Sequence, residues 1–259
     1  MDLFALDPHV ILTFLFALMR VSLVLFLMPF FGGQTLPAPV KAALCLTLTF
    51  ALWPRLPLAG HELPAHPFGL ALMLASELIL GLVLGLAIRF LFAAIQTGGQ
   101  LIGFQMGFAM VNAVDPDSGV SEAVTAHFLY MVSLLTFLTF NGHLYLLDGL
   151  LKSFDFIPPG GINVSHGLAS QIFLLSGQIF LLAIQIGAPA LAAILLTDLA
   201  LALVSRAAPQ MNVLIIGFPI KIGIGFLFLG IIFEIISLYA EGFISRMPAL
   251  FTQLINLMR

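Results

Sequence analysis

Charged side chains are scarce in this 259-residue chain, in which nine Lys and Arg and twelve Asp and Glu make up 8% of the residues. There is no run of basic residues, so neither binding to nucleic acid nor a polybasic contact with anionic lipid is expected. No Lys or Arg precedes the first apolar run, and Arg20 lies within that run, which argues against a secretory leader with a basic start.

Cysteine is also nearly absent. Cys45 is the single cysteine, which excludes a disulfide framework and a thiolate metal site. His127 and His143 are sixteen residues apart and would face nearly opposite sides of one helix, so they predict no local metal pair. The sequence holds no HExxH or GxSxG motif and no phosphate-binding glycine loop. We therefore expect no catalytic residue, no metal and no cofactor.

Apolar residues, in contrast, make up 61% of the chain, and the mean hydropathy is +1.16. This is more apolar surface than a soluble domain of the same length would bury, so the composition indicates a membrane protein. Several apolar runs reach the roughly 20 residues that a helix needs to cross the hydrocarbon core. The runs are Val10–Phe31, Val40–Trp53, Phe68–Ala94, Ala123–Leu151, Gly167–Val204 and Val213–Ala240.

The lengths of these runs are uneven. Val40–Trp53 is too short to span a bilayer, whereas Gly167–Val204 is long enough for two elements. Pro189 divides the longer run and predicts either a kinked helix or two helices, because proline lacks a backbone donor. Short and interrupted runs are typical of helices packed mainly against protein. We predict an all-α fold of the integral-membrane type, with helical hairpins and kinked helices in a single domain, residues 1–259.

One row of residues on the helix expected over Phe68–Ala94 combines charge with glycine. Glu77, Gly81, Gly85 and Arg89 follow one another at four-residue spacing, which places them along one face. Glu77 and Arg89 are about 18 Å apart on a helix, so each needs a partner on another element. Structural ion pairs are the favoured interpretation, and binding of a transported ion is the alternative.

Other charged residues lie in or beside apolar runs, where an unpaired charge is costly, so we expect them to be paired or packed against protein. Asp198 and Lys221 lie on consecutive expected helices on either side of Pro209 and are predicted to meet. The other members of this group are Arg20, Lys41 and Glu234.

Gln171, Gln178 and Gln185 recur every seven residues, a step that drifts only about 20° around a helix. They therefore form one polar stripe on an apolar helix. Hydrogen bonding of these amides between neighbouring helices is the favoured interpretation, and the lining of an aqueous path is the alternative.

The segment Gly99–Gly119 contains two conflicting periods. Gly99, Gly103 and Gly107 lie four residues apart, a spacing that lets another backbone approach one face of a helix. In contrast, Phe104, Met106, Phe108 and Met110 alternate with a period of two, which an extended segment would align on one side. The segment is interrupted by Asp115-Pro116-Asp117, so we predict a loop held inside a helical bundle.

Several motifs resemble the FliR family of flagellar export-gate subunits and their injectisome counterparts. The most specific are Ala208-Pro209-Gln210-Met211-Asn212 followed by Gly217-Phe218-Pro219, and Asn141-Gly142-His143 after a Phe-rich run. Gly103–Gly107 with Asp115-Pro116 is similar to a third block. Arg20 and Pro39-Val40-Lys41 are similar to the N-terminal region, so the resemblance covers nearly the whole chain.

The resemblance implies a single copy that assembles with P-type and Q-type subunits into a conical gate, through which unfolded flagellar proteins pass. It also implies contact with membrane lipid and with the A-type and B-type export proteins, in the bacterial inner membrane at the flagellar basal body. Much of the apolar surface would then pack against sister subunits, and energy coupling would reside in partner proteins, not in an enzymatic site here.

The same resemblance places a pore plug in the segment with conflicting periods. Met is deformable and Phe is bulky, so such residues close a pore to ions yet yield to a passing chain. Simple packing of these side chains in a helix is the alternative. The residues assigned to the plug are Phe104, Met106, Gly107, Phe108, Met110, Val111, Asn112, Val114, Asp115 and Pro116.

Three other functions compete with a flagellar export gate. A virulence injectisome subunit has the same architecture, although Gly217-Phe218-Pro219 and Asn141-Gly142-His143 favour the flagellar system. A secondary transporter would use Glu77, Arg89 and Asp198, but the sequence contains no convincing repeat. A membrane enzyme has no nucleophile or metal cluster to support it.

Overall fold

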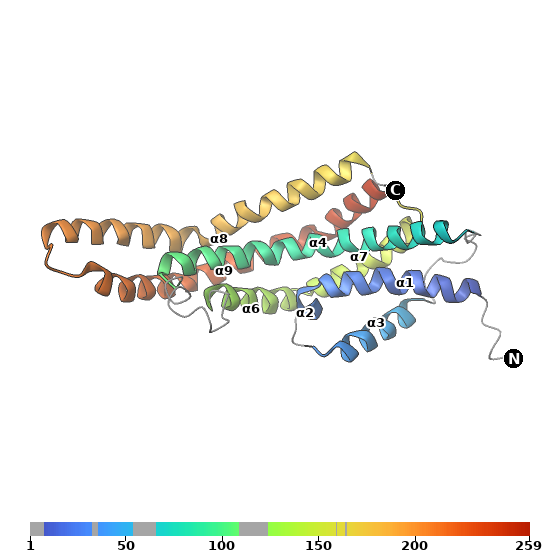
Figure 1. Cartoon of the computed structure of the whole chain (residues 1–259), viewed down its shortest axis with the longest axis horizontal. Coiled ribbons are helices and arrows are strands. Elements are labelled where there is room, and N and C mark those ends of the chain that lie inside the picture. Colours follow the sequence, from blue (N-terminus) through green and yellow to red (C-terminus); the bar gives the residue numbers. More distant parts are fainter. Residues whose placement is uncertain (1–7, 33–35, 54–65, 109–123, 159, 164) are drawn as a thin grey trace. The chain divides into compact units, whose positions relative to one another are not determined.

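The computed structural model describes residues 8–32, 36–53, 66–108, 124–158, 160–163 and 165–259. The described elements are all helices, which confirms the all-α prediction (Figure 1). They are α1 (Pro8–Leu27), α2 (Pro29–Gly32), α3 (Ala38–Leu52), α4 (Pro67–Met106), α6 (Val124–Thr139), α7 (Gly142–Phe156), α8 (His166–Ala207) and α9 (Val213–Met258).

Two helices extend well beyond the apolar runs that predicted them. α4 continues past Ala94 to Met106, and α9 continues past Ala240 to Met258. α8 is one helical element of 42 residues that contains Pro189, so the alternative of two separate helices is wrong. Hydropathy underestimated these helices because their last turns carry glycine, glutamine and charge, which a helix tolerates when neighbouring helices contact it.

The apolar run Ala123–Leu151 forms two helices because the chain breaks at Asn141. Asn141 has a φ of 57°, in the left-handed region, and precedes the first residue of α7. Asparagine is among the non-glycine residues that adopt this conformation most readily. The Asn-Gly dipeptide was thus the local signal for a helix boundary that the continuous hydropathy concealed.

The chain divides into two compact units. Unit 1 comprises Met1–Phe90, Asn141–Leu175 and Ile244–Arg259, and unit 2 comprises Leu91–Phe140 and Ser176–Phe243. The boundaries fall inside α4, α8 and α9 and beside the break between α6 and α7. The prediction of a single domain over the whole chain stays a prediction.

In unit 1, α1 lies along the glycine row of α4. A Cβ atom on Gly81 would lie 2.9 Å from Leu23 Cβ, and one on Gly85 would lie 2.5 Å from Leu27 Cβ. The contacts advance in the same direction along both helices, so α1 and α4 run parallel. Absence of a side chain at these two glycines allows the close backbone approach that small residues give to membrane helices.

In unit 2, the second part of α4 packs against α6, α8 and α9. Gly99 lies against the backbone of Ala126, and Thr125 Oγ1 donates a hydrogen bond of 2.8 Å to the carbonyl of Gly99. Gly98 lies against the carbonyl of Ala183 in α8. The buried core of the unit is formed by Leu91, Ile95, Ile102, Met106, Leu129, Ile186, Ala190, Ile194, Leu229, Ile232 and Ile236.

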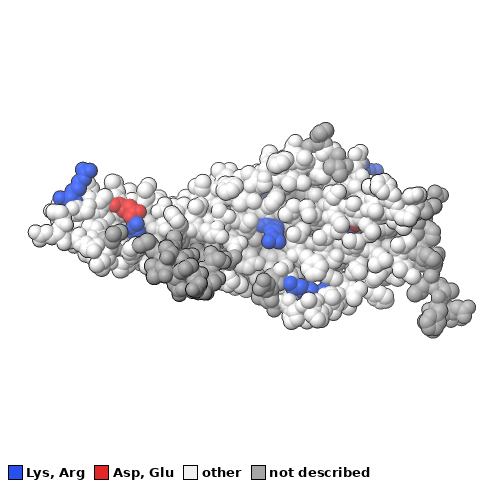
Figure 2. Space-filling view, in the orientation of Figure 1, with Lys and Arg blue, Asp and Glu red and all other residues white. Residues whose placement is uncertain are grey.

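Four of the described helices are long and apolar enough to cross a membrane, namely α1, α4, α8 and α9. The number is five if α6 and α7 together form one broken span. Figure 2 shows that the visible face of the described residues carries few Lys, Arg, Asp or Glu side chains. These features agree with the membrane assignment made from composition.

Candidate functional site

Arg20 is completely buried in unit 1 and binds Glu77 with two hydrogen bonds. Arg20 Nε donates to Glu77 Oε2 at 2.6 Å, and Arg20 Nη2 donates to Glu77 Oε1 at 2.9 Å. The side chains are 0% and 1% exposed. This two-point geometry matches the planar guanidinium to the carboxylate and is the strongest form of such a pair.

The end of α7 supplies the remaining partners of Arg20. Nη1 donates to Ser153 Oγ at 3.2 Å, and Nη2 also donates to the carbonyl of Ile157 at 3.2 Å. The guanidinium carbon lies 4.1 Å from the centre of the Phe154 ring, within the range of a cation–π contact. Arg20 thus connects α1, α4 and α7, and the residues around it satisfy its charge.

Two residues that we grouped as buried charges are exposed, and this part of the prediction is wrong. Arg89 belongs to the glycine row of α4, but α1 ends at Leu27, opposite Gly85, so the row extends one turn beyond the helix that covers it. Glu234 is exposed because Ile232 and Ile236 are the buried positions of this turn, and two residues correspond to about 200° around a helix.

Lys221 and Asp198 form an ion pair in unit 2, between Lys221 Nζ on α9 and Asp198 Oδ1 on α8. Sequence analysis had paired these two residues. Their side chains are 20% and 37% exposed, so the pair is only partly shielded. The pair lies at a cavity of about 230 Å³, whose other lining residues are Leu201, Ala202, Ser205, Val213, Gly217 and Phe218.

The carboxyl-terminal end of α4 contains the first residues assigned to the plug. Phe104 and Met106 lie in the last turn of the helix, so the prediction of a loop is wrong for these two residues. Phe104 is 69% exposed and Met106 is fully buried, because two residues face nearly opposite sides of a helix. The four-residue glycine spacing, not the two-residue alternation, indicated the correct structure here.

Gly107 ends α4 with a φ of 93°, in the left-handed region. The Gly107 N–H donates to the Phe104 carbonyl and the Phe108 N–H donates to the Gly103 carbonyl, each at 3.1 Å. This pair of bonds is the Schellman motif, in which glycine is favoured at the residue with positive φ. Phe108 is partly buried against the core of unit 2. Met110, Val111, Asn112, Val114, Asp115 and Pro116 lie outside the described residues.

The glutamine stripe of α8 is mostly exposed. Gln171, in unit 1, is partly buried, whereas Gln178 and Gln185, in unit 2, are exposed. Gln185 Oε1 accepts a hydrogen bond of 3.0 Å from the Tyr239 hydroxyl of α9. The amide at this position therefore bonds to a neighbouring helix.

Lys41, another residue from the predicted group of charges, is partly buried in the first turn of α3.

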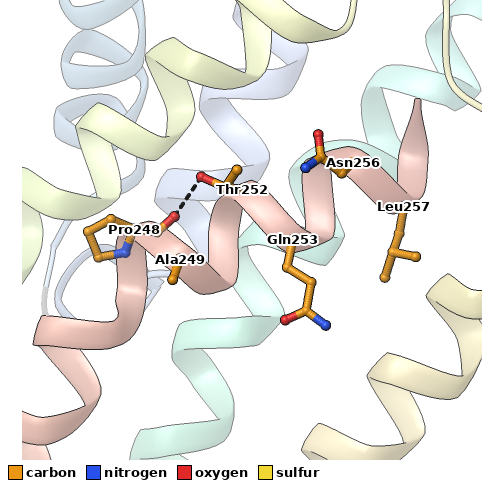
Figure 3. Close-up of a pocket in the computed structure, with 6 residues that line it drawn as sticks. All are labelled: Pro248, Ala249, Thr252, Gln253, Asn256 and Leu257. Atoms are coloured by element: carbon orange, nitrogen blue, oxygen red, sulfur yellow. Dashed lines mark hydrogen bonds between the residues drawn. The ribbon is translucent and has the colours of Figure 1, made fainter.

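A second open pocket lies along the last turns of α9, in unit 1 (Figure 3). Its polar lining consists of Thr252, Gln253 and Asn256, and the Thr252 hydroxyl donates to the Pro248 carbonyl at 2.8 Å. The lining carries no ionised group. Among the described residues, no three His, Cys, Asp or Glu side chains lie close enough together to hold a metal ion.

Comparison with known proteins identifies the family. The family model described as bacterial export proteins, family 1, matches residues 11–247. The chain belongs to this family. Its relatives within bacterial export family 1 include the flagellar biosynthetic protein FliR of Escherichia coli (strain K12), 32% identical over 92% of this chain and 91% of that protein.

Two further relatives define the breadth of the match. The flagellar biosynthetic protein FliR of Bacillus subtilis (strain 168) is 31% identical over 90% of each chain. The surface presentation of antigens protein SpaR of Salmonella typhimurium is 26% identical over 87% of this chain and 84% of that protein. As a family 1 export protein, the chain is a membrane subunit of a type III export apparatus in the bacterial cell membrane, at the flagellar basal body.

The sequence of this export protein did not reveal every residue of the site. Ser153 and Phe154 contact Arg20 across 133 and 134 positions, and no local pattern connects them. Phe218 was noticed only as part of a family motif, although its ring lies against Gly107. Both omissions are contacts between residues far apart in the sequence, and the spacing of residues along a single sequence does not reveal such contacts.

Proposed function

We propose that this chain is a structural, non-enzymatic subunit of the flagellar export gate, which assembles with P-type and Q-type subunits into a pore for unfolded flagellar proteins. The A-type and B-type export proteins are further expected partners. The observation that carries the proposal is the amount of apolar helix surface that the chain itself leaves uncovered, together with its family.

The lengths of α8 and α9 make this argument quantitative. Helices of 42 and 46 residues are about 63 and 69 Å long, whereas the hydrocarbon core is about 30 Å thick. In the most apolar stretch of each helix, 18 residues long, only 28% of α8 and 22% of α9 is buried within the chain. A bilayer covers less than half of such a helix, so sister subunits are the partners expected to cover the remaining apolar surface.

The charges inside the chain support a structural role over ion transport. Both carboxylate oxygens of Glu77 accept hydrogen bonds from Arg20, and Asp198 is paired with Lys221. Carboxylates that bind a transported ion need coordination sites that are open to that ion. The two carboxylates that a secondary transporter would use are therefore engaged within the chain.

The plug role assigned to residues from Phe104 to Pro116 forms part of this proposal. It is supported by the helix end at Gly107, which places the end of α4 two residues before residues 109–123 of the sequence. Deletion of Met106–Val114 is expected to make membranes that contain the assembled gate leak small ions. Deletion of the nine residues 56–64 is the matched control, and equal conductance of the two variants would contradict the plug.

Copurification and secretion assays test the assembly. Affinity purification of the tagged chain from membranes is expected to recover the P-type and Q-type subunits, and deletion of the gene is expected to abolish swimming and export of flagellar proteins. Recovery of the chain alone as a monodisperse protein would contradict the proposal. Normal motility combined with loss of virulence-protein secretion would assign the chain to an injectisome, the system suggested by the more distant SpaR similarity.

A further inference from the structure

The aromatic ring of Phe218, on α9, lies directly against the glycine that ends α4. A Cβ atom on Gly107 would lie 2.5 Å from Phe218 Cε1 and 2.6 Å from Cδ1. These distances are shorter than any that real Cβ atoms make, so the ring occupies the volume that a side chain at position 107 would need. Glycine is therefore required here for two reasons, the positive φ and the contact with the ring.

A second contact fixes the same helix end about two turns further along α9. The Met106 side chain packs over Gly225, where an added Cβ would lie 2.5 Å from Met106 Sδ. Met106 is fully buried, and Phe108 packs against the core of unit 2. The end of α4 thus contacts α9 at two positions, the ring of Phe218 against Gly107 and the surface of Gly225 against Met106.

Phe218 is in turn part of the wall of the cavity that contains the Lys221–Asp198 pair. Phe218 and Lys221 are three residues apart on α9 and share a face of the helix. The ion pair connects this turn of α9 to α8, so it restrains the turn that carries the ring. The Lys221–Asp198 ion pair and the contact between Phe218 and Gly107 are therefore made by neighbouring positions on one face of α9.

The geometry points to Phe218 as the positioning residue that keeps the end of α4 in its capped conformation, and so sets the direction in which the chain enters the segment after Phe108. The role of that segment as a plug rests on the proposed function; the contact between Phe218 and Gly107 does not. The Lys221–Asp198 pair restrains the turn of α9 that carries Phe218.

Hydrogen exchange of the assembled gate tests the positioning role directly. In Phe218→Ala, the peptide that contains the Gly107 and Phe108 amides is expected to exchange roughly ten-fold faster, because loss of the ring frees the two bonds of the cap. Phe226→Ala, a change at an exposed phenylalanine of the same helix, is the matched control and should leave this exchange unchanged. Phe218→Tyr retains the ring and should restore protection. Unchanged exchange in Phe218→Ala would overturn the inference.

A double-mutant cycle gives a second, independent measurement. Gly107→Ala introduces both backbone strain and the clash with the ring, whereas in the Phe218→Ala background only the strain remains. The two changes are therefore expected to be non-additive in their effect on exchange and on the yield of the assembled complex. If Phe218→Ala fails to assemble, the cycle is measured with Phe218→Leu. Strictly additive effects would show that the contact carries no positioning role.

Ion conductance separates this inference from the proposed function. Faster exchange together with increased leakage in Phe218→Ala supports both the positioning role and the plug. Faster exchange without any change in conductance or in secretion supports the positioning role and overturns the plug. Asp198→Asn is expected to accelerate hydrogen exchange at Gly107 as well, but by a smaller factor than Phe218→Ala. If the Gly107 amide in Asp198→Asn is as well protected as in Phe218→Tyr, the ion pair has no part in positioning Phe218.

Discussion

The Arg20–Glu77 pair of unit 1 and the Lys221–Asp198 pair of unit 2 differ in how completely protein surrounds them. Arg20 and Glu77 are fully buried, and Ser153, Phe154 and Ile157 contact the same guanidinium. Lys221 and Asp198 border a cavity and stay partly exposed. A buried pair is strongly coupled to folding because losing one partner leaves an uncompensated charge, whereas an exposed pair is screened.

The difference indicates two kinds of charge use in one apolar chain. In unit 1, the charge joins three helices, two of which, α1 and α4, approach closely at the glycines of α4. In unit 2, the charge joins two long helices near a surface that sister subunits are expected to cover. The variants below are ordered from the largest expected effect to the smallest.

Glu77→Gln is expected to give the largest loss, about 3–5 kcal/mol in the free energy of unfolding, because Arg20 then stays buried without a counter-charge. The measurement is thermal unfolding of the purified complex in detergent. The double variant Arg20→Met with Glu77→Met should lose clearly less, because it removes both charges. A double variant as unstable as the single one would show that the pair contributes more than mutual neutralisation.

Gly85→Leu separates helix packing from charge in unit 1. A side chain at this position would collide with Leu27, so α1 is expected to be displaced, at a cost of about 1–3 kcal/mol. Gly177→Leu is the matched control, because nothing lies within 4 Å of its added Cβ. Equal unfolding temperatures for the two variants would contradict the close approach of α1 and α4.

Asp198→Lys and Lys221→Asp test the partly exposed pair of unit 2. Each single reversal is expected to cost about 1 kcal/mol, since the pair is incompletely shielded. The double reversal should restore stability and secretion, because it rebuilds the pair in the opposite order. Failure of the double reversal to recover either property would argue against a direct pairing.

Lys152→Ala is expected to have the smallest effect. Lys152 pairs with Asp148 one turn away on α7, and the two side chains are about half exposed, at 47% and 50%. Such pairs contribute about 0.3–0.5 kcal/mol, so unfolding and secretion should be nearly unchanged. A loss of stability comparable to that of Glu77→Gln would mean that the stability contributed by these three ion pairs does not follow how deeply each pair is buried.

Much of the fold was predictable from residue types and spacing, because a charge or glycine on an apolar helix needs a specific neighbour. Asp198 and Lys221 were paired from their positions on either side of Pro209, and the glycine row of α4 correctly predicted a protein contact. The exposure of Arg89 was not predictable, since it depends on where α1 ends. The partners of Arg20 on α7 depend on contacts between distant segments, which hydropathy and periodicity do not contain.

The site was less predictable than the fold at the end of α4. The alternation of Phe104, Met106 and Phe108 favoured an extended segment, yet Phe104 and Met106 lie in a helix whose end is determined by Gly107. Packing of Met106 against Gly225 prevailed over the local pattern. A single sequence shows the glycines but not which helix they meet.

The order in which the chain is synthesised gives the buried arginine a further consequence. Arg20 is made 57 residues before Glu77 and 133 residues before Ser153. At 5–20 residues per second, Arg20 waits roughly 3–11 seconds for its counter-charge. During that interval α1 carries an unpaired charge, so we expect it to remain near the membrane surface or against other protein, and to enter its final environment only together with α4.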